Sequence, residues 1–69
     1  MSIGQNIKQL RERFGLTQQQ LGEIAGVTDK AVSSWEQDAS SPRMGAIQRM
    51  ADYFKIPKSA IIEGTPDPT

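Results

Sequence analysis

Polar side chains between positions 29 and 37 have a spacing that an α-helix would bring to one side. At about 100° per residue, four of them fall within an arc of roughly 100°, with Asp29 at its edge; the four are Lys30, Ser33, Ser34 and Gln37. Their ammonium, hydroxyl, carboxamide and carboxylate groups are of the kinds that bond base edges and phosphates in the major groove of DNA. An ordinary solvated helix face carries the same groups, so the choice depends on the elements that position them.

Two short helices joined by a tight turn are predicted to position these polar side chains. Thr17 and Gln20 have the spacing of a capping box, in which each side chain bonds the other's backbone N–H, so a helix begins just after Thr17. Gly26 follows the apolar residues of that helix and can adopt the positive φ with which helices commonly end. Thr28 then caps the next helix. This is the layout of a helix-turn-helix over residues 17–37.

The other side of the second helix is apolar, since Ala31, Val32 and Trp35 cluster there. Trp35 could stack on a base, but its place among apolar neighbours favours a core position that anchors the helix. One core is therefore expected from residues along the whole chain: Leu10, Leu21, Val32, Trp35, Ile47, Phe54 and Ile61.

Three further helices are predicted, and no segment has the period of a strand. The first covers residues 3–14 before Gly15, the second begins at Pro42 with Ser41 as its cap, and the third is opened by Pro57, buries Ile61 and Ile62, and stops at Gly64. Residues 65–69 are expected to form a Pro-rich tail or linker. The prediction is a compact five-helix, all-α domain over residues 1–64.

Composition excludes several classes of protein. The 69 residues contain no cysteine and no histidine, which rules out disulfides and a zinc finger. No apolar run approaches the roughly 18 residues of a membrane span, and no signal peptide is recognisable, so a cytoplasmic location is expected. No nucleophile–base arrangement or phosphate-binding glycine loop is present, and the chain is not expected to be an enzyme.

The charge balance is unusual for a nucleic-acid binder, because the formal net charge is zero and the isoelectric point is about 6.1. Two of the acidic residues, Glu63 and Asp67, lie in the last seven positions, so residues 1–62 carry a net charge of +2. Lys8, Lys30 and Arg43 are candidates for a local positive face, and weak non-specific affinity for DNA is expected.

Taken together, these positions resemble the lambda-repressor/Cro-like helix-turn-helix family. The matching elements are Thr-Gln-x-x-Leu from Thr17, Gly-Val-Thr at 26–28, Val-Ser-x-Trp-Glu at 32–36, Pro42, and the ending from Ile56-Pro57 to Ile61-Ile62-Glu63-Gly64. The resemblance covers about residues 3–64, and such a linked set is highly specific. Asp38 departs from the pattern, which usually has glycine there. Since Asp tolerates left-handed backbone, the turn is still expected to form.

The polar face and the resemblance together imply individual roles. Bases are expected to be read by Asp29, Lys30, Ser33 and Ser34. The DNA backbone is expected to be bound by Thr17, Gln18, Thr28, Gln37, Ser41 and Arg43, with Gln18 aided by the helix N-terminus. The resemblance further implies an ion pair between Arg11 and Glu36 that links the first and third helices.

The expected function is that of a phage or bacterial transcriptional regulator, by default a repressor, that binds a palindromic operator in double-stranded DNA as a homodimer. The resemblance places the dimer contact on the last helix. No cofactor, metal or small-molecule ligand is expected. The alternative is a protein-interaction module on the same scaffold, such as an antitoxin-like or adaptor domain, for which the neutral charge leaves room; only a DNA binder should show salt-sensitive affinity for duplexes.

Overall fold

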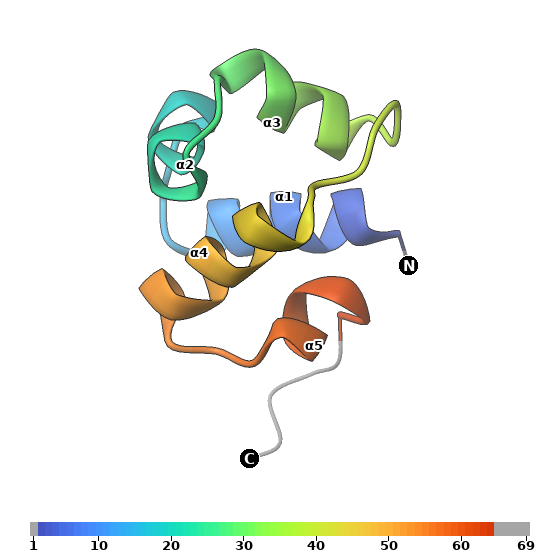
Figure 1. Ribbon diagram of the computed structural model, residues 1–69. Helices are drawn as coiled ribbons and strands as arrows, with labels where there is room; N and C mark the ends of the chain where they lie inside the picture. The colour runs from blue at the N-terminus through green and yellow to red at the C-terminus, as the bar shows by residue number, and fades with distance from the viewer. Residues whose placement is uncertain (1, 65–69) are drawn as a thin grey trace.

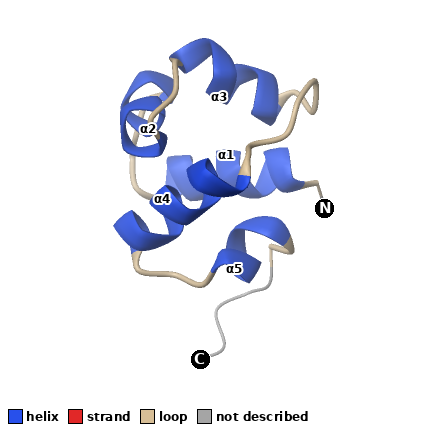
Figure 2. Ribbon diagram, in the orientation of Figure 1, coloured by secondary structure: helices blue, strands red, loops and turns tan. Residues whose placement is uncertain are grey.

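The computed structural model describes residues 2–64, which form five helices and no strand (Figures 1 and 2). The helices are α1 (Ile3–Arg13), α2 (Gln18–Ala25), α3 (Asp29–Glu36), α4 (Met44–Phe54) and α5 (Lys58–Ile62). This confirms the all-α prediction. The predicted tail at 65–69 lies outside the described residues. No described helix has the length and apolar composition needed to cross a membrane.

The turn between α2 and α3 forms through the local contacts that the sequence predicted. Thr17 Oγ1 accepts a hydrogen bond from Gln20 N at 3.1 Å, and Thr17 N donates to Gln20 Oε1 at 2.9 Å, which completes the capping box. Gly26 ends α2 with φ 78°. Thr28 Oγ1 caps α3 by accepting from Ala31 N at 3.2 Å. The relative direction of α2 and α3 is thus fixed at both ends of a very short connection.

A single apolar core joins the five helices. Figure 1 shows α3 and α5 at opposite ends of the domain, with α1 and α4 between them. Six of the seven predicted core residues are buried, and Leu10 is half-buried at the edge of the core. The core contains Ile7, Leu21, Ala25, Val32, Trp35, Ala46, Ile47, Met50, Ala51, Phe54 and Ile61. Because α3 contributes Val32 and Trp35, its apolar side is held inward and its polar side is turned out.

The first helix packs unusually closely on the end of α3. A Cβ added at Gly4 would overlap the carbonyl oxygen of Trp35, so only glycine permits this approach. At the other end, α1 stops at Arg13, and Phe14 follows as its C-cap. Phe14 is 52% exposed, and its ring packs on the ring of Phe54 with centroids 4.6 Å apart.

The predicted start of the fourth helix was wrong by two residues. Ser41 and Pro42 belong to the connection, and α4 begins at Met44 with Arg43 as an N-cap that has no side-chain capping bond. Pro42 is buried, so it packs into the domain as part of an extended segment and does not open the helix. Ser41 and Arg43 are exposed in the connection between α3 and α4.

The last helix is tied to the first by a buried side chain. Asn6 Nδ2 donates to the carbonyl oxygen of Ile61 at 3.0 Å. As predicted, Ile61 is buried and Pro57 immediately precedes the helix, but Ile62 is 38% exposed. Adjacent side chains on a helix point about 100° apart, and in α5 it is Ile61 that faces the core while Ile62 points toward the surface.

Candidate nucleic-acid interface

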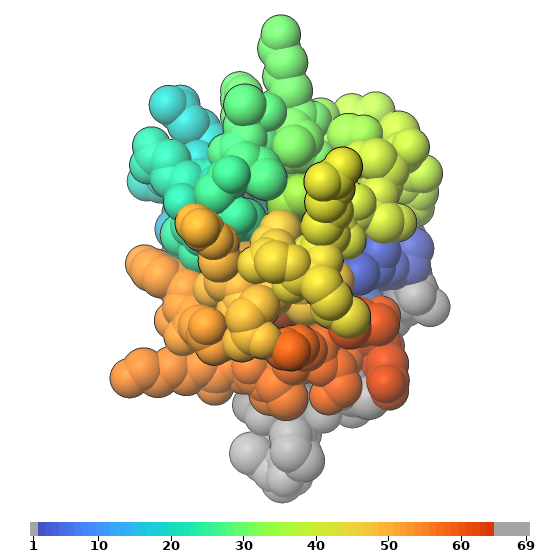
Figure 3. Space-filling model, viewed as in Figure 1, coloured from blue at the N-terminus to red at the C-terminus, as the bar shows by residue number. Residues whose placement is uncertain are grey.

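The polar face of α3, formed by Asp29, Lys30, Ser33, Ser34 and Gln37, lies at the surface of the domain. Asp29, Lys30 and Gln37 are exposed, whereas Ser33 and Ser34 are half-buried. Figure 3 shows α3 in green at the upper edge of the molecule, with one long side chain projecting outward from it. The face is therefore exposed at its two ends and half-buried at the two serines between them.

Two contacts order the serine hydroxyls of this face. Gln37 Nε2 donates to Ser33 Oγ at 3.0 Å, one turn along the helix. Ser34 Oγ lies 2.8 Å from Ser40 Oγ in the loop that follows α3. Nothing in the sequence singled out Ser40, because the contact depends on how the loop returns to the helix.

A network of hydrogen bonds fixes the end of α3 to its neighbours. Arg11 Nε donates to Glu36 Oε2 at 2.7 Å, and Arg11 Nη2 donates to Glu36 Oε1 at 3.1 Å. Gln18 Nε2 donates to the same Oε1 at 3.1 Å, and Arg11 Nη1 donates to the carbonyl oxygen of Leu16 at 2.9 Å. One carboxylate thus joins α1, the start of α2 and the end of α3.

The charges of this network are stabilised by the contacts around them. Burial opposes ionisation of Glu36, but hydrogen bonds from Arg11 and Gln18 and the charge of Arg11 outweigh it, so the pKa of Glu36 is lowered. The hydrogen bond to Glu36 raises the pKa of Arg11 despite the opposing effect of burial. Both groups are therefore charged near neutral pH, and the pair is structural because the Glu36 side chain is only 5% exposed.

Gln18 has a different environment from the one expected from the sequence. Its amide nitrogen donates to Glu36, a contact that the sequence did not predict. The second amide hydrogen of Gln18 and the position of this residue at the N-terminus of α2 remain compatible with an anion near the helix end.

The other residues assigned to the DNA backbone lie at two places. Thr17 and Thr28 are exposed N-caps, and each hydroxyl already accepts a backbone bond, which leaves its own O–H available as a donor. Ser41 and Arg43 are exposed in the connection between α3 and α4. The helix starts and this connection flank the polar face of α3 along the chain.

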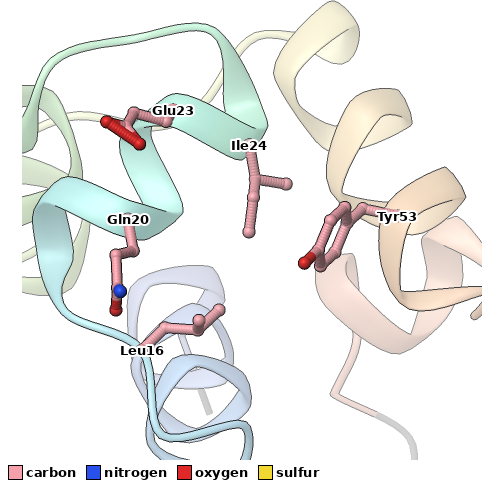
Figure 4. Close-up of a pocket in the computed structure, with 5 residues that line it drawn as sticks. All are labelled: Leu16, Gln20, Glu23, Ile24 and Tyr53. Atoms are coloured by element: carbon pink, nitrogen blue, oxygen red, sulfur yellow. The ribbon is translucent and has the colours of Figure 1, made fainter.

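A shallow groove elsewhere on the surface is lined by both apolar and polar side chains. It lies between α2 and α4 and is lined by Leu16, Gln20, Glu23, Ile24 and Tyr53 (Figure 4). Gln20 is engaged in the capping box. Within residues 2–64 no group of three or more His, Cys, Asp or Glu side chains is placed to hold a metal ion. The polar face of α3 is consequently the best-defined candidate site.

Two capped helices joined through a left-handed glycine, with the polar side of the second turned outward in a five-helix domain, define the helix-turn-helix class. A family model described as helix-turn-helix matches residues 7–61. The chain belongs to this family, in its lambda-repressor/Cro-like branch, as its sequence predicted.

Curated relatives share the domain over part of their length. The HTH-type transcriptional regulator PuuR of Escherichia coli K12 is 29% identical over 56 residues, which cover 81% of this chain and 30% of PuuR. The immunity repressor protein of Bacillus phage phi105 is 34% identical over 62 residues, covering 90% of this chain and 43% of the repressor. The chain thus spans less than half the length of either protein.

Solved structures show the same fold. The P22 c2 repressor, crystallised with a synthetic operator, superposes with a TM-score of 0.85 at 22% identity, covering 94% of this chain and 98% of that one. The SOS-response repressor LexA of Eubacterium rectale gives a TM-score of 0.78 at 28% identity, covering 97% of this chain and 74% of that one. These likenesses agree with the five-helix architecture described above.

Proposed function

We propose that this domain binds double-stranded DNA by placing α3 in the major groove, and that it acts in transcriptional regulation. The observation that carries the proposal is the exposed polar face of α3, held outward by buried Val32 and Trp35 and fixed at its end by Glu36. A helix presented in this way can approach base edges without rearrangement of the fold.

The proposed division of labour follows the chemistry of each group. Asp29, Lys30, Ser33 and Ser34 read bases, with Lys30 donating to guanine O6 and N7 and Asp29 accepting from cytosine N4. The backbone is bound by Thr17, Gln18, Thr28, Gln37, Ser41 and Arg43. The hydroxyl and amide contacts are neutral, which fits a domain without a large positive charge.

The names of the relatives support the regulatory role. The matched proteins are called transcriptional regulators, one is a phage repressor, and the P22 c2 structure contains operator DNA. We propose that this chain likewise binds a palindromic operator as a homodimer and represses by occupying a site that RNA polymerase needs. Such a mechanism requires no catalytic residue and no cofactor.

Selection of bound sites from random duplexes, followed by sequencing, tests this proposal. An inverted repeat should emerge whose half-site centres are about 34 Å apart, one turn of DNA. Affinity for the selected site should fall as the salt concentration rises, but only modestly, because Arg43 is the one cation among the proposed backbone contacts. Failure to enrich any sequence, with no salt-dependent affinity for duplexes, would favour the protein-interaction module instead.

A further inference from the structure

Ser34 and Ser40 form a pair of hydroxyls at the end of the polar face. Their oxygens are 2.8 Å apart, which is the ordinary distance of an O–H to O hydrogen bond. Ser34 is half-buried on α3 and Ser40 is exposed in the following loop. Either oxygen can be the donor, so one of the two protons is used between the residues and the other is available to a third group.

The backbone of the loop holds Ser40 at this position. Asp38 adopts φ 61° and turns the chain back over the end of α3, where Asp38 N donates to the carbonyl oxygen of Trp35 at 3.0 Å. Ala39 N and Ser40 N both donate to the carbonyl oxygen of Ser34, at 2.9 and 3.4 Å. Ser40 is therefore anchored to the same residue through its main chain and its side chain.

We propose that Ser40 is a positioning residue for sequence reading by Ser34. This inference rests on the proposed function, because it assumes that the polar face of α3 meets DNA. A lone serine hydroxyl rotates freely and can donate or accept, which makes it a poor discriminator between bases. In this proposal Ser40 donates to Ser34 Oγ, so the O–H of Ser34 points away from Ser40, is polarised by the bond it accepts, and is presented to an acceptor on a base edge.

Ser33 provides a matched control within the same helix. Its hydroxyl is bonded by Gln37, the C-cap of α3, and not by Ser40 of the following loop. Removal of the Gln37 side chain should alter the contact of Ser33 and leave that of Ser34 unchanged. The two serine hydroxyls thus have different hydrogen-bond partners, Gln37 for Ser33 and Ser40 for Ser34. Loss of each partner should alter discrimination at a different base pair of the bound DNA.

The test measures binding of the intact chain to every single base-pair variant of its selected site. Ser34→Ala, Ser40→Ala, the double variant and Gln37→Ala are compared with the unaltered protein. Ser34→Ala and Ser40→Ala should each reduce discrimination at the same base pair, by about 2- to 10-fold for Ser40→Ala, and the double variant should equal Ser34→Ala alone. Gln37→Ala should weaken binding to all sequences through the loss of its proposed backbone contact, and should change discrimination only at the base pair that Ser33 reads.

Two further variants separate positioning from a loss of folding. Ser40→Thr keeps the hydroxyl, and Ser40→Val has the shape of threonine without a hydroxyl. Discrimination between bases should survive in Ser40→Thr and fall in Ser40→Val, while both variants melt at similar temperatures. Equal weakening at all sequences would make Ser40 a phosphate contact, and an additive double variant would make it independent of Ser34; either result overturns the inference. If the unaltered chain selects no sequence, the proposed function fails and this inference fails with it.

Discussion

Arg11 on α1 forms a bidentate ion pair with Glu36, the last residue of α3, through two hydrogen bonds of 2.7 and 3.1 Å. The side chains are only 16% and 5% exposed, so the pair is screened from water. Because Gln18 donates to the same carboxylate, α1 and α2 both act on the end of the helix that carries the polar face. The orientation of that face therefore depends on a contact outside the helix-turn-helix itself.

Arg11→Met should destabilise the domain by about 3–5 kcal/mol, since it leaves a buried carboxylate without its charged partner. It also removes the donor to the carbonyl oxygen of Leu16. Urea unfolding of Arg11→Met, Glu36→Gln and the double variant gives the coupling energy, which should be clearly non-zero. Glu12→Gln, at an exposed position of α1, is the control and should change stability little. Additive effects of the two changes would refute the coupling.

Acid should weaken the fold through Glu36. Its pKa is lower in the folded domain than in an unfolded chain, so ionised Glu36 stabilises the fold above its unfolded pKa. This contribution should be lost as the pH falls through the unfolded pKa toward the lower folded one. The free energy of unfolding, measured between pH 7 and pH 3, should decline more in the unaltered protein than in Glu36→Gln. Glu23→Gln, at an exposed site on α2, should retain the full decline; identical pH profiles for all three would contradict the assignment.

Trp35→Ala should cost about 3–5 kcal/mol, most of the stability available to so small a domain. Trp35 is buried where α3 meets the core, and its carbonyl oxygen lies against Gly4 of α1. Tyr53→Ala removes an exposed aromatic ring and serves as the comparison. Thermal melting should show a large shift for the first change only, and a cooperative transition of Trp35→Ala near the temperature of the unaltered protein would show that the core has been misassigned.

The parts of the fold that the sequence predicted are those fixed by local contacts. The capping box of Thr17, the left-handed Gly26 and the cap at Thr28 depend on residues three or four positions apart, and all three form as expected. The start of α4 could not be read in this way. Pro42 has the same backbone preference in a helix's first turn and in an extended segment, and its burial against distant residues determines the outcome.

In the candidate site, too, features that depend on local spacing could be predicted from the sequence, and contacts between distant residues could not. Periodicity alone indicated that Lys30 and Ser33 share one side of α3. The pairing of Arg11 with Glu36 came only from family resemblance, because it joins residues 25 positions apart. The contact between Ser34 and Ser40 requires the return of the loop at Asp38, which the sequence permitted but did not specify. Asn6 did carry a signal, since it is a polar residue within the apolar spacing of α1.

Ile62→Asp should weaken dimer formation on DNA. Of the two adjacent isoleucines of α5, Ile61 is 1% exposed and belongs to the core, so only Ile62 is available to a second copy. A carboxylate at the contact should make binding to the two half-sites less cooperative, with little effect on a single half-site. Tyr53→Asp places the same charge on α4 and should not have this effect. Full cooperativity of Ile62→Asp, seen in binding curves and footprints, would move the dimer contact away from α5.

Lys30→Ala and Arg43→Ala should change DNA recognition in different ways. Lys30 lies on the exposed side of α3 and is proposed to donate to a guanine, so its loss should cost about 1–3 kcal/mol at one base pair and relax the preference there. Arg43 lies in the connection before α4 and is proposed to bind a phosphate, so its loss should weaken all sequences alike and reduce the salt dependence by about one unit per half-site. Arg43 is a better reference than Gln18, because Gln18 also bonds Glu36 and its replacement would disturb the fold. Binding of both variants to a library of single base-pair changes separates the two roles. Uniform weakening by Lys30→Ala would reassign Lys30 to the DNA backbone and leave base reading to Asp29 and the two serines.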